Sequence, residues 1–180
     1  MPFDIDTSYP IEAYSPERIQ GAYLIVHPKI LERYNITRAD FYGVFERGSN
    51  FSQLKYPITD DYWNIFYDSE WYYMAERFND LEIKKAIAQA SKIKWHSKKV
   101  AYKYREIMNQ NDADRIEFMR EAIKRKYDES KWRRWLLQET GTREIIEFTY
   151  WGDRFFWIDC GDKTGRNILW KLHMEYRNIL

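Results

Sequence analysis

A helical repeat of apolar residues runs through the middle of this chain of 180 residues. Its members recur at spacings of three and four residues, which places them on one face of an α-helix. Asp114 followed by Glu117 resembles a capping box and predicts that the helix begins at Asp114. A helix with one apolar face needs other elements to cover that face. The residues of the stripe are Ile116, Met119, Ile123 and Tyr127.

Other segments predict further helices and a few short strands. Asp68 or Ser69 is a plausible N-cap for a helix to about Asn79, and Thr140-Gly141 is a typical helix stop. We therefore expect a mainly α, multihelical fold with a small β component in a single compact domain. The other expected helices lie at 81–89, within 92–108, around Trp132 to Leu136, and from near Asn167 to the end. The expected strands lie at 22–26, 145–148 and 155–159, with a turn at 162–165.

Composition excludes several classes of protein. The formal net charge is +1, from 29 Lys+Arg against 28 Asp+Glu, so the strongly basic field of many nucleic-acid binders is absent. The single cysteine, Cys160, cannot form an internal disulfide. No stretch approaches the roughly 20 apolar residues of a membrane span. We expect a soluble, cytoplasmic protein that does not associate with membranes.

Common cofactor and metal motifs are missing from the sequence. The three histidines show no ligand spacing with the cysteine, so we expect no metal site. There is no Walker loop, no GxGxxG and no nucleophile elbow. We expect no cofactor.

Two carboxylates stand in contexts that suggest chemistry. Glu70 begins a predicted helix among aromatic residues, and Asp153 follows Trp151-Gly152. Cleavage of an N-glycosidic bond develops positive charge on the ribose ring, which a fixed carboxylate stabilises more in the transition state than in the ground state. Alternatively, Glu70 interacts with the helix dipole and Asp153 is an ordinary turn residue.

Other residues suit a phosphate or a base. Free backbone N–H groups at Gly165-Arg166-Asn167 could hold a phosphate at the start of the last helix, and Arg77 could contact one with two hydrogen bonds. Tyr150 and Trp151 could stack on a base. Alternatively, Asn167 is an ordinary helix cap, Arg77 pairs with a glutamate at the surface, and Tyr150 and Trp151 pack in the core.

Taken together, the separated motifs resemble the NADAR (NAD and ADP-ribose) superfamily, also called YbiA-like, over residues 40 to 178 in the right order. The motifs are listed here in chain order: Asn50-Phe51-Ser52, Ser69-Glu70 through Arg77-Phe78, Thr140-Gly141, Ile146-Glu147, Tyr150-Trp151-Gly152-Asp153, Gly165-x-Asn167-x-Leu169 and Met174-Glu175-x-Arg177. The resemblance implies a NADAR-like domain at 41–180. Residues 1–40, punctuated by prolines, would be an N-terminal extension packed on or flanking it.

The resemblance also implies a hydrolase: an N-glycosidase that needs no metal and cleaves the bond between a base-like amine and a phosphorylated ribose. Members act on riboflavin-pathway intermediates, or remove ADP-ribose from modified guanine in nucleic acid as antitoxins of ADP-ribosyltransferase toxins. The ligand would be of the ADP-ribose or ribose-phosphate type, and ADP-ribosylated nucleic acid a possible partner. Carried onto this chain, Glu70, Asp153 and Arg77 are the catalytic candidates. The candidates for substrate binding are Asn50, Tyr73, Tyr150, Trp151, Gly152, Gly165 and Asn167.

Two residues depart from the family pattern. Arg77-Phe78 stands where the family has lysine and phenylalanine, and Trp170 stands where a glycine normally follows the leucine. A lysine amine can attack an opened sugar, whereas a guanidinium, always protonated, cannot. If the reaction needs that amine, the protein is inactive or works by direct attack of water.

Three functions therefore remain open. The first is an N-glycosidase, with ADP-ribosyl-guanine preferred over riboflavin intermediates because aromatic residues surround the motifs. The second is a catalytically inactive protein that binds ADP-ribose or related nucleotides. The third is an interaction protein whose aromatic residues form a surface and whose site is vestigial.

Overall fold

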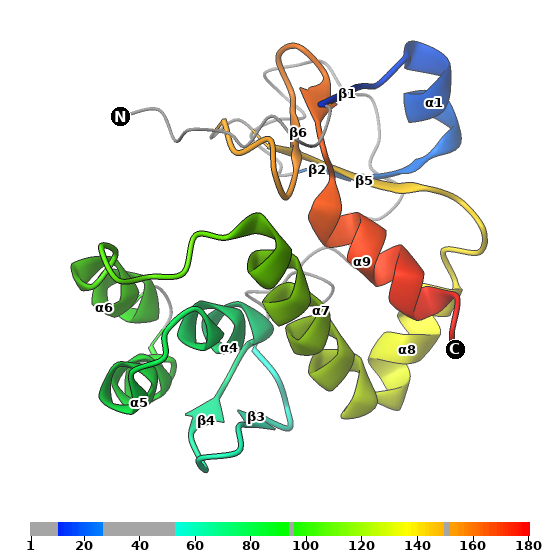
Figure 1. The fold of residues 1–180 in the computed structure, drawn as a ribbon. Coiled ribbons are helices and arrows are strands. Elements are labelled where there is room, and N and C mark those ends of the chain that lie inside the picture. The colour runs from blue at the N-terminus through cyan, green and yellow to red at the C-terminus, as the bar shows by residue number, and fades with distance from the viewer. Residues whose placement is uncertain (1–10, 27–52, 94–95, 150–151) are drawn as a thin grey trace. The chain divides into compact units, whose positions relative to one another are not determined.

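The computed structural model describes residues 11–26, 53–93, 96–149 and 152–180. The chain divides into two compact units, Met1–Phe45 with Trp135–Leu180 (unit 1) and Glu46–Arg134 (unit 2). The described residues form seven helices and seven short strands (Figure 1). The expected mainly α fold with a small β component is confirmed.

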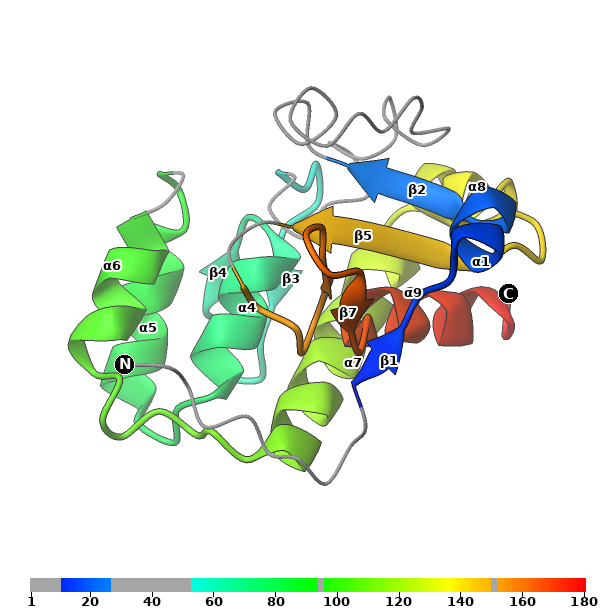
Figure 2. The ribbon, with the colours of Figure 1, turned by 90° about the horizontal axis from the view of Figure 1, so that it is seen from above.

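Unit 1 is built on a five-stranded mixed sheet with the order β1-β7-β6-β5-β2. β2 pairs in parallel with β5, with Tyr23 opposite Ile145 and Val26 opposite Phe148, and the two strands run side by side in Figure 2. β5 continues in parallel to β6, whereas β6, β7 and β1 are antiparallel. The strands are β1 (Glu12–Ala13), β2 (Tyr23–Val26), β5 (Ile145–Thr149), β6 (Ile158–Asp159) and β7 (Thr164–Gly165).

Apolar side chains of these strands form the core of unit 1. β2 and β5 are short, largely apolar segments, and most of their side chains are buried, as is usual for strands that pair in parallel. Helix α1 (Pro16–Gly21), capped by Ser15, connects β1 to β2, and α9 (Ile168–Arg177) packs against β5. The core cluster consists of Tyr14, Ala22, Val26, Ile146, Phe148, Ile158 and Cys160, the last a free, buried thiol.

The predicted strand at 155–159 is mostly wrong. Only Ile158–Asp159 forms a strand, because the Asp153 carboxylate accepts hydrogen bonds from the backbone N–H groups of Phe155 and Phe156 and holds a turn there. The predicted strands at 22–26 and 145–148 are confirmed.

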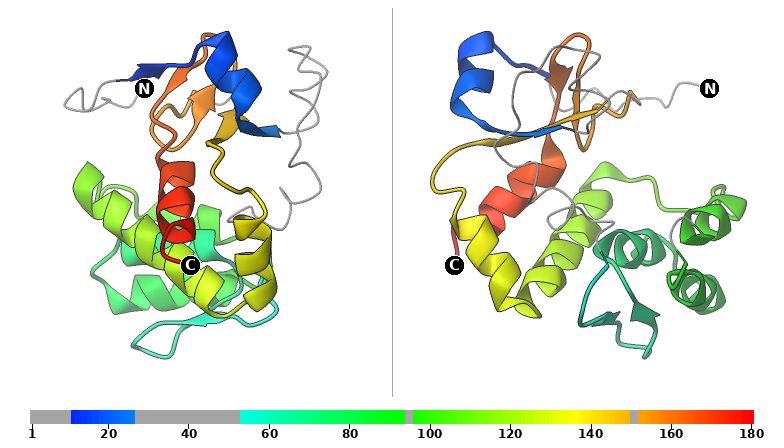
Figure 3. Two further views of the ribbon diagram at one scale, coloured as in Figure 1. Left: turned by 90° about the vertical axis from the view of Figure 1, so that its right-hand side faces the viewer. Right: turned by 180° about the vertical axis from the view of Figure 1, so that it is seen from behind.

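Unit 2 is a group of helices with one small hairpin (Figure 3). Helix α4 packs against α5, α6 and α7, so most of its side chains are buried. The hairpin of β3 (Ile58–Thr59) and β4 (Ile65–Phe66) turns at Asp60, whose carboxylate accepts from two backbone amides of the loop. The helices are α4 (Ser69–Glu76), α5 (Leu81–Ala90), α6 (His96–Lys103) and α7 (Asp112–Asp128), and α8 (Lys131–Gln138) follows across the boundary between the units.

The structure corrects the predicted start of α7. Asn111, not Asp114, is the N-cap, and its side chain accepts from the Asp114 backbone N–H at 3.1 Å. Met119, Ile123 and Tyr127 are buried as predicted, whereas Ile116 is half-buried. The carboxylate of Asp114 instead accepts from the Asn109 side-chain amide at 2.7 Å and so ties the first turn of α7 to the loop before it.

Within the described residues no helix is long and apolar enough to cross a membrane.

Candidate functional site

Glu70 lies in the first turn of α4 and is half-buried. Asp68 caps this helix as predicted, and its carboxylate accepts from the Trp71 backbone N–H at 2.9 Å. The cap fixes where the helix begins and therefore where Glu70 projects. Glu70, Tyr73 and Arg77 follow one another at helical spacing on the same side of α4.

The Asp68 carboxyl carries an unusual protonation state. Its pKa is raised to about 8, chiefly by burial. The negative charge of Glu70 contributes to this rise, whereas the backbone hydrogen bond from Trp71 and the positive charge of Lys126 oppose it. The Lys126 side chain is fully buried. The first turn of α4 thus gathers two carboxyl groups and a buried ammonium group.

Arg77 is buried at the C-terminal end of α4. Its Nε donates to the Asn109 carbonyl at 3.0 Å, and its Nη2 donates to Gln110 Oε1 at 2.7 Å. The Asn109 backbone N–H in turn donates to the Arg77 carbonyl at 2.8 Å. Desolvation lowers the pKa of the guanidinium, with Arg115 adding to the effect and Glu70 opposing it, but an arginine stays charged. In unit 2, Arg77 therefore anchors the loop before α7 while keeping its charge within range of Glu70.

Tyr73 lies between these groups and is also buried. Burial raises the pKa of its phenol, against the influence of the Arg77 and Arg115 charges. The Arg77 guanidinium carbon lies 5.6 Å from the centre of the Tyr73 ring. Tyr73 is therefore a neutral phenol that packs under the arginine.

In unit 1, Gly152 and Asp153 lead into the turn before β6. Gly152 has a φ of +76°, and a Cβ there would meet nothing within 4 Å, so the glycine serves the backbone conformation. Asp153 Oδ1 accepts from the N–H groups of Phe155 at 2.9 Å and Phe156 at 3.2 Å. Oδ2 of the same carboxylate makes no hydrogen bond with the part of the chain that the structure describes. The turn thus holds the carboxylate in a fixed orientation by one oxygen.

The start of α9 offers fewer free amides than expected. The N–H groups of Arg166, Ile168 and Leu169 donate to the carbonyls of residues 154, 155 and 156, at 2.8, 3.3 and 3.2 Å. Of the amides predicted to hold a phosphate, those of Gly165, Arg166 and Asn167, the Arg166 N–H is therefore already engaged. Gly165 lies in β7, where a Cβ would stand 2.2 Å from the Trp157 carbonyl oxygen, so its glycine serves the strand pairing.

Asn167, a substrate-binding candidate, is fully buried beneath this segment. Its φ of +51° is left-handed, and its side-chain amide donates to the Ile145 carbonyl at 2.7 Å. It stands at the N-cap position of α9 without capping the helix through its side chain. Asn167 therefore ties the start of α9 to the start of β5.

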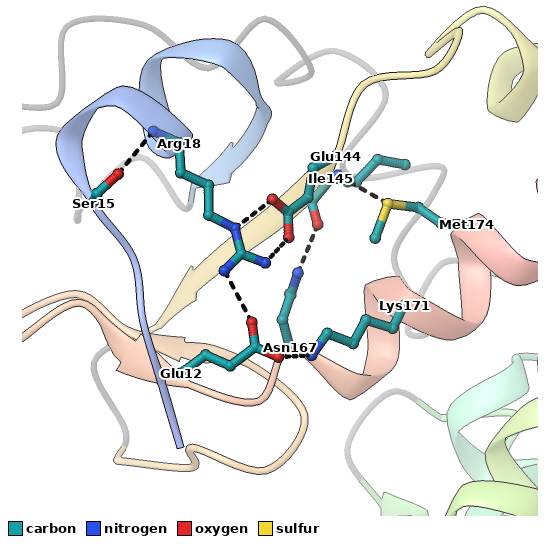
Figure 4. Close-up of polar contacts among 8 residues, drawn as sticks. All are labelled: Glu12, Ser15, Arg18, Glu144, Ile145, Asn167, Lys171 and Met174. Atoms are coloured by element: carbon teal, nitrogen blue, oxygen red, sulfur yellow. Dashed lines mark hydrogen bonds and ion pairs between the residues drawn. The ribbon is translucent and has the colours of Figure 1, made fainter. Parts of the chain in front are cut away.

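A network of charges surrounds this tie (Figure 4). The Arg18 guanidinium donates to both carboxylate oxygens of Glu144, at 2.7 and 2.6 Å, and to Glu12 at 2.9 Å. Lys171 on α9 also pairs with Glu12. Residues 12–18 are thereby joined to the beginning of β5 and to α9.

Two tryptophans, one of them the Trp170 that departs from the family pattern, donate to one carboxylate. Glu147 Oε2 accepts from the indole N–H groups of Trp157 at 2.9 Å and Trp170 at 2.6 Å. The Trp170 ring is buried and stacks on His173 with centroids 4.2 Å apart. The sequence did not indicate Glu147 as their shared acceptor, because the two tryptophans lie 10 and 23 positions away from it.

The remaining candidates are placed as follows. Glu70, Tyr73 and Arg77 belong to unit 2, and Gly152, Asp153, Gly165 and Asn167 belong to unit 1. Asn50, Tyr150 and Trp151 lie outside the described residues. Within the described ranges, no group of three or more His, Cys, Asp or Glu side chains could hold a metal ion.

Unit 2 also contains a cavity of about 410 Å³ that sequence reasoning missed. It lies among residues 53–56, the C-terminal end of α7 and the first residues of α8. Lys126, the buried cation near Asp68, is one of its walls.

Comparisons with known proteins agree on one family. The model of the NADAR domain matches residues 38–180 and so includes residues of both units. The chain is similar to proteins named N-glycosidase YbiA from Shigella flexneri and from Escherichia coli strain K12, at 26% identity over 165 residues, or 92% of this chain and 97% of each relative. The NMR structure of the E. coli protein YbiA shares the fold, with a TM-score of 0.63, 23% identity, and coverage of 93% of this chain and 90% of that one. Because the family model covers well over half of its length, the chain belongs to the NADAR domain family.

Proposed function

We propose that this protein is a hydrolase that cleaves an N-glycosidic bond between a base and a phosphorylated ribose. The supporting observation is the match to N-glycosidases over 92% of this chain, which includes both candidate carboxylates. Removal of ADP-ribose from modified guanine is the first candidate reaction. An enzyme that ADP-ribosylates guanine must then supply the substrate, which suggests a partner system of that kind.

The carboxylates suit this chemistry. In the bond cleavage, the ribose ring gains positive charge as the base departs, and a carboxylate held in place stabilises that charge without reorganising. Asp153 is held by two backbone N–H groups through Oδ1, which leaves Oδ2 for a sugar or a water. Glu70 is positioned by the capped first turn of α4. We propose that a carboxylate held in this way stabilises the charge on the ring or orients the attacking water.

The first test measures release of ADP-ribose from guanine-modified DNA by the wild type, Glu70→Gln and Asp153→Asn. Each substitution keeps the side-chain size and removes the charge, so we expect a loss of about 100-fold or more in kcat. Glu82→Gln and Asp159→Asn are matched controls: Glu82 lies in the first turn of α5, and Asp159 also accepts a backbone amide in a turn. Equal activity in the wild type and both site variants would overturn the assignment of the carboxylates.

The same assay with early riboflavin intermediates separates the two substrate classes. Cleavage of these intermediates without release of ADP-ribose would replace the first candidate reaction by the second. The aromatic residues after Asp153 do not decide between them, because Phe155 and Phe156 are buried.

A second candidate function, binding without catalysis, is favoured by Arg77. This side chain is charged, buried and committed to Asn109 and Gln110, so no amine stands at the position where the family has lysine. Comparison of the wild type with Arg77→Lys tests this function. Activity in the wild type excludes it, whereas activity in Arg77→Lys alone supports it.

A further inference from the structure

The cavity in unit 2 has the size of a site for a small molecule. Its volume of about 410 Å³ lies within the range of ~300–1,000 Å³ that is usual for ligand pockets. All of its wall residues belong to residues 53–133 and therefore to one compact unit. Its walls come from residues 53–56, the last turn of α7, the link at Glu129 and Ser130, and the first turn of α8.

The wall carries more positive than negative charge. Among the described residues of the wall, three are cationic, Lys55, Lys126 and Arg133, and one is a carboxylate, Glu129. Lys126 is 0% exposed and Arg133 is 9% exposed, whereas cationic side chains are seldom so deeply buried. The nearby carboxyl of Asp68 has its pKa raised to about 8 by burial, so near pH 7 it is mostly protonated and balances little of this charge. An anion in the cavity would meet a positive field of low dielectric.

Arg133 is held in place before any ligand arrives. Its Nη2 donates to the Gln53 carbonyl at 3.2 Å, and its backbone N–H donates to Ser130 Oγ at 3.3 Å. A guanidinium fixed in this way loses little conformational freedom when it binds an anion.

Two aromatic rings complete the wall. Tyr56 is 55% exposed and Trp132 is 42% exposed, and both line the cavity. Exposed aromatic faces beside cations suit a ligand that carries a planar ring as well as phosphate.

We propose that this cavity binds the phosphate-bearing part of a nucleotide, with Lys55 and Arg133 contacting phosphate oxygens and Tyr56 or Trp132 stacking on a ring. The inference rests on the proposed function and identifies where its substrate is held. Lys126, a wall residue, acts electrostatically on Asp68, which caps α4 two residues before Glu70.

Calorimetric titration of the full chain with ADP-ribose and with inorganic pyrophosphate tests the proposal. We expect saturable binding of both, weakening with added salt. Lys55→Glu and Arg133→Gln each remove a cation from the wall and should weaken binding about tenfold or more. Lys85→Gln is the matched control, because Lys85 is an exposed lysine on α5 that does not line the cavity. Trp132→Ala should weaken ADP-ribose and leave pyrophosphate unchanged.

The outcomes separate this proposal from the proposed function. Unchanged affinity in Lys55→Glu and in a folded Arg133→Gln would overturn the cavity as the phosphate site, even if the wild type hydrolyses its substrate. Binding that follows these variants in a protein that hydrolyses nothing would keep the cavity and remove the N-glycosidase. Because Lys55 is exposed and makes no hydrogen bond with the described residues, its variant is informative even if Arg133→Gln fails to fold.

Discussion

Gly165→Ala should destabilise unit 1 severely. Gly165 of β7 pairs with Ile158 of β6 and with Glu12 of β1, so it lies in the middle of three strands. A Cβ at this position would stand 2.2 Å from the Trp157 carbonyl oxygen and 2.9 Å from the Ile158 Cα. Both are backbone atoms, so the added methyl group can be accommodated only if the strands separate.

The expected cost is about 3 kcal/mol or more, the upper range for overpacking. At ~2–4 °C per kcal/mol for a protein of this size, Tm should fall by about 6–12 °C. Thermal unfolding followed by circular dichroism measures it.

Two other glycines serve as controls for this experiment. Gly21→Ala introduces a Cβ that meets nothing within 4 Å at an ordinary φ, so it should leave Tm unchanged or raise it slightly. Gly141→Ala also meets nothing within 4 Å but at a φ of +61°, so it should cost about 1–2 kcal/mol. A Gly165→Ala protein that melts within about 2 °C of the wild type, a change of ~1 kcal/mol or less, would refute the packing argument.

Three further perturbations test other parts of the structure. Glu147→Leu leaves the indole N–H groups of Trp157 and Trp170 without their carboxylate acceptor and should lower the free energy of unfolding by about 2–4 kcal/mol. Glu147→Gln should lower it less, because the amide oxygen still accepts a hydrogen bond. Urea titrations of both variants measure these changes. Between about pH 4 and 8 the folded protein retains a proton on Asp68 that the unfolded chain releases, so the free energy of unfolding falls as pH rises through this range. Asp68→Asn can still cap the helix but cannot titrate, so it should reduce this pH dependence. Unfolding curves of both proteins at pH 5 and pH 8 measure the difference. Arg18→Met breaks the partly exposed ion pairs of Figure 4 and should cost about 1 kcal/mol at low salt, with a smaller difference from the wild type in 1 M salt.

Arg77 shows how a departure from a family pattern acquires meaning from the structure. The sequence shows only that a guanidinium replaces an amine. The structure adds that the guanidinium is buried and donates to Asn109 and Gln110, which precede α7. A lysine at this position has one nitrogen instead of a planar fork and could not make both contacts in the same geometry. Arg77→Lys therefore tests loop anchoring as well as chemistry, and its thermal stability should be measured beside its activity.

The helices were predictable because their signals are local. The cap at Asp68, the apolar spacing from Met119 to Tyr127 and the stop at Thr140-Gly141 all act within a few residues, and each matches the structure. The errors also have local causes: Asn111 competes with Asp114 as the cap of α7, and Asp153 turns an aromatic run that has strand-like composition.

Contacts between distant residues were decided by tertiary structure. The pairing of β2 with β5 joins Tyr23 to Ile145, and the acceptor shared by Trp157 and Trp170 is Glu147. The cavity in unit 2 joins residues 53–56 to the ends of two helices more than 60 positions later. The sequence by itself determined the helical segments, the candidate carboxylates and the family resemblance, because capping, periodicity and motifs are written in neighbouring residues. Tertiary structure decided three other features: the order of the strands in the sheet, the burial of Arg77 and Asn167, and the charged cavity. Each of them forms only when side chains far apart in the sequence pack against one another and lose contact with water.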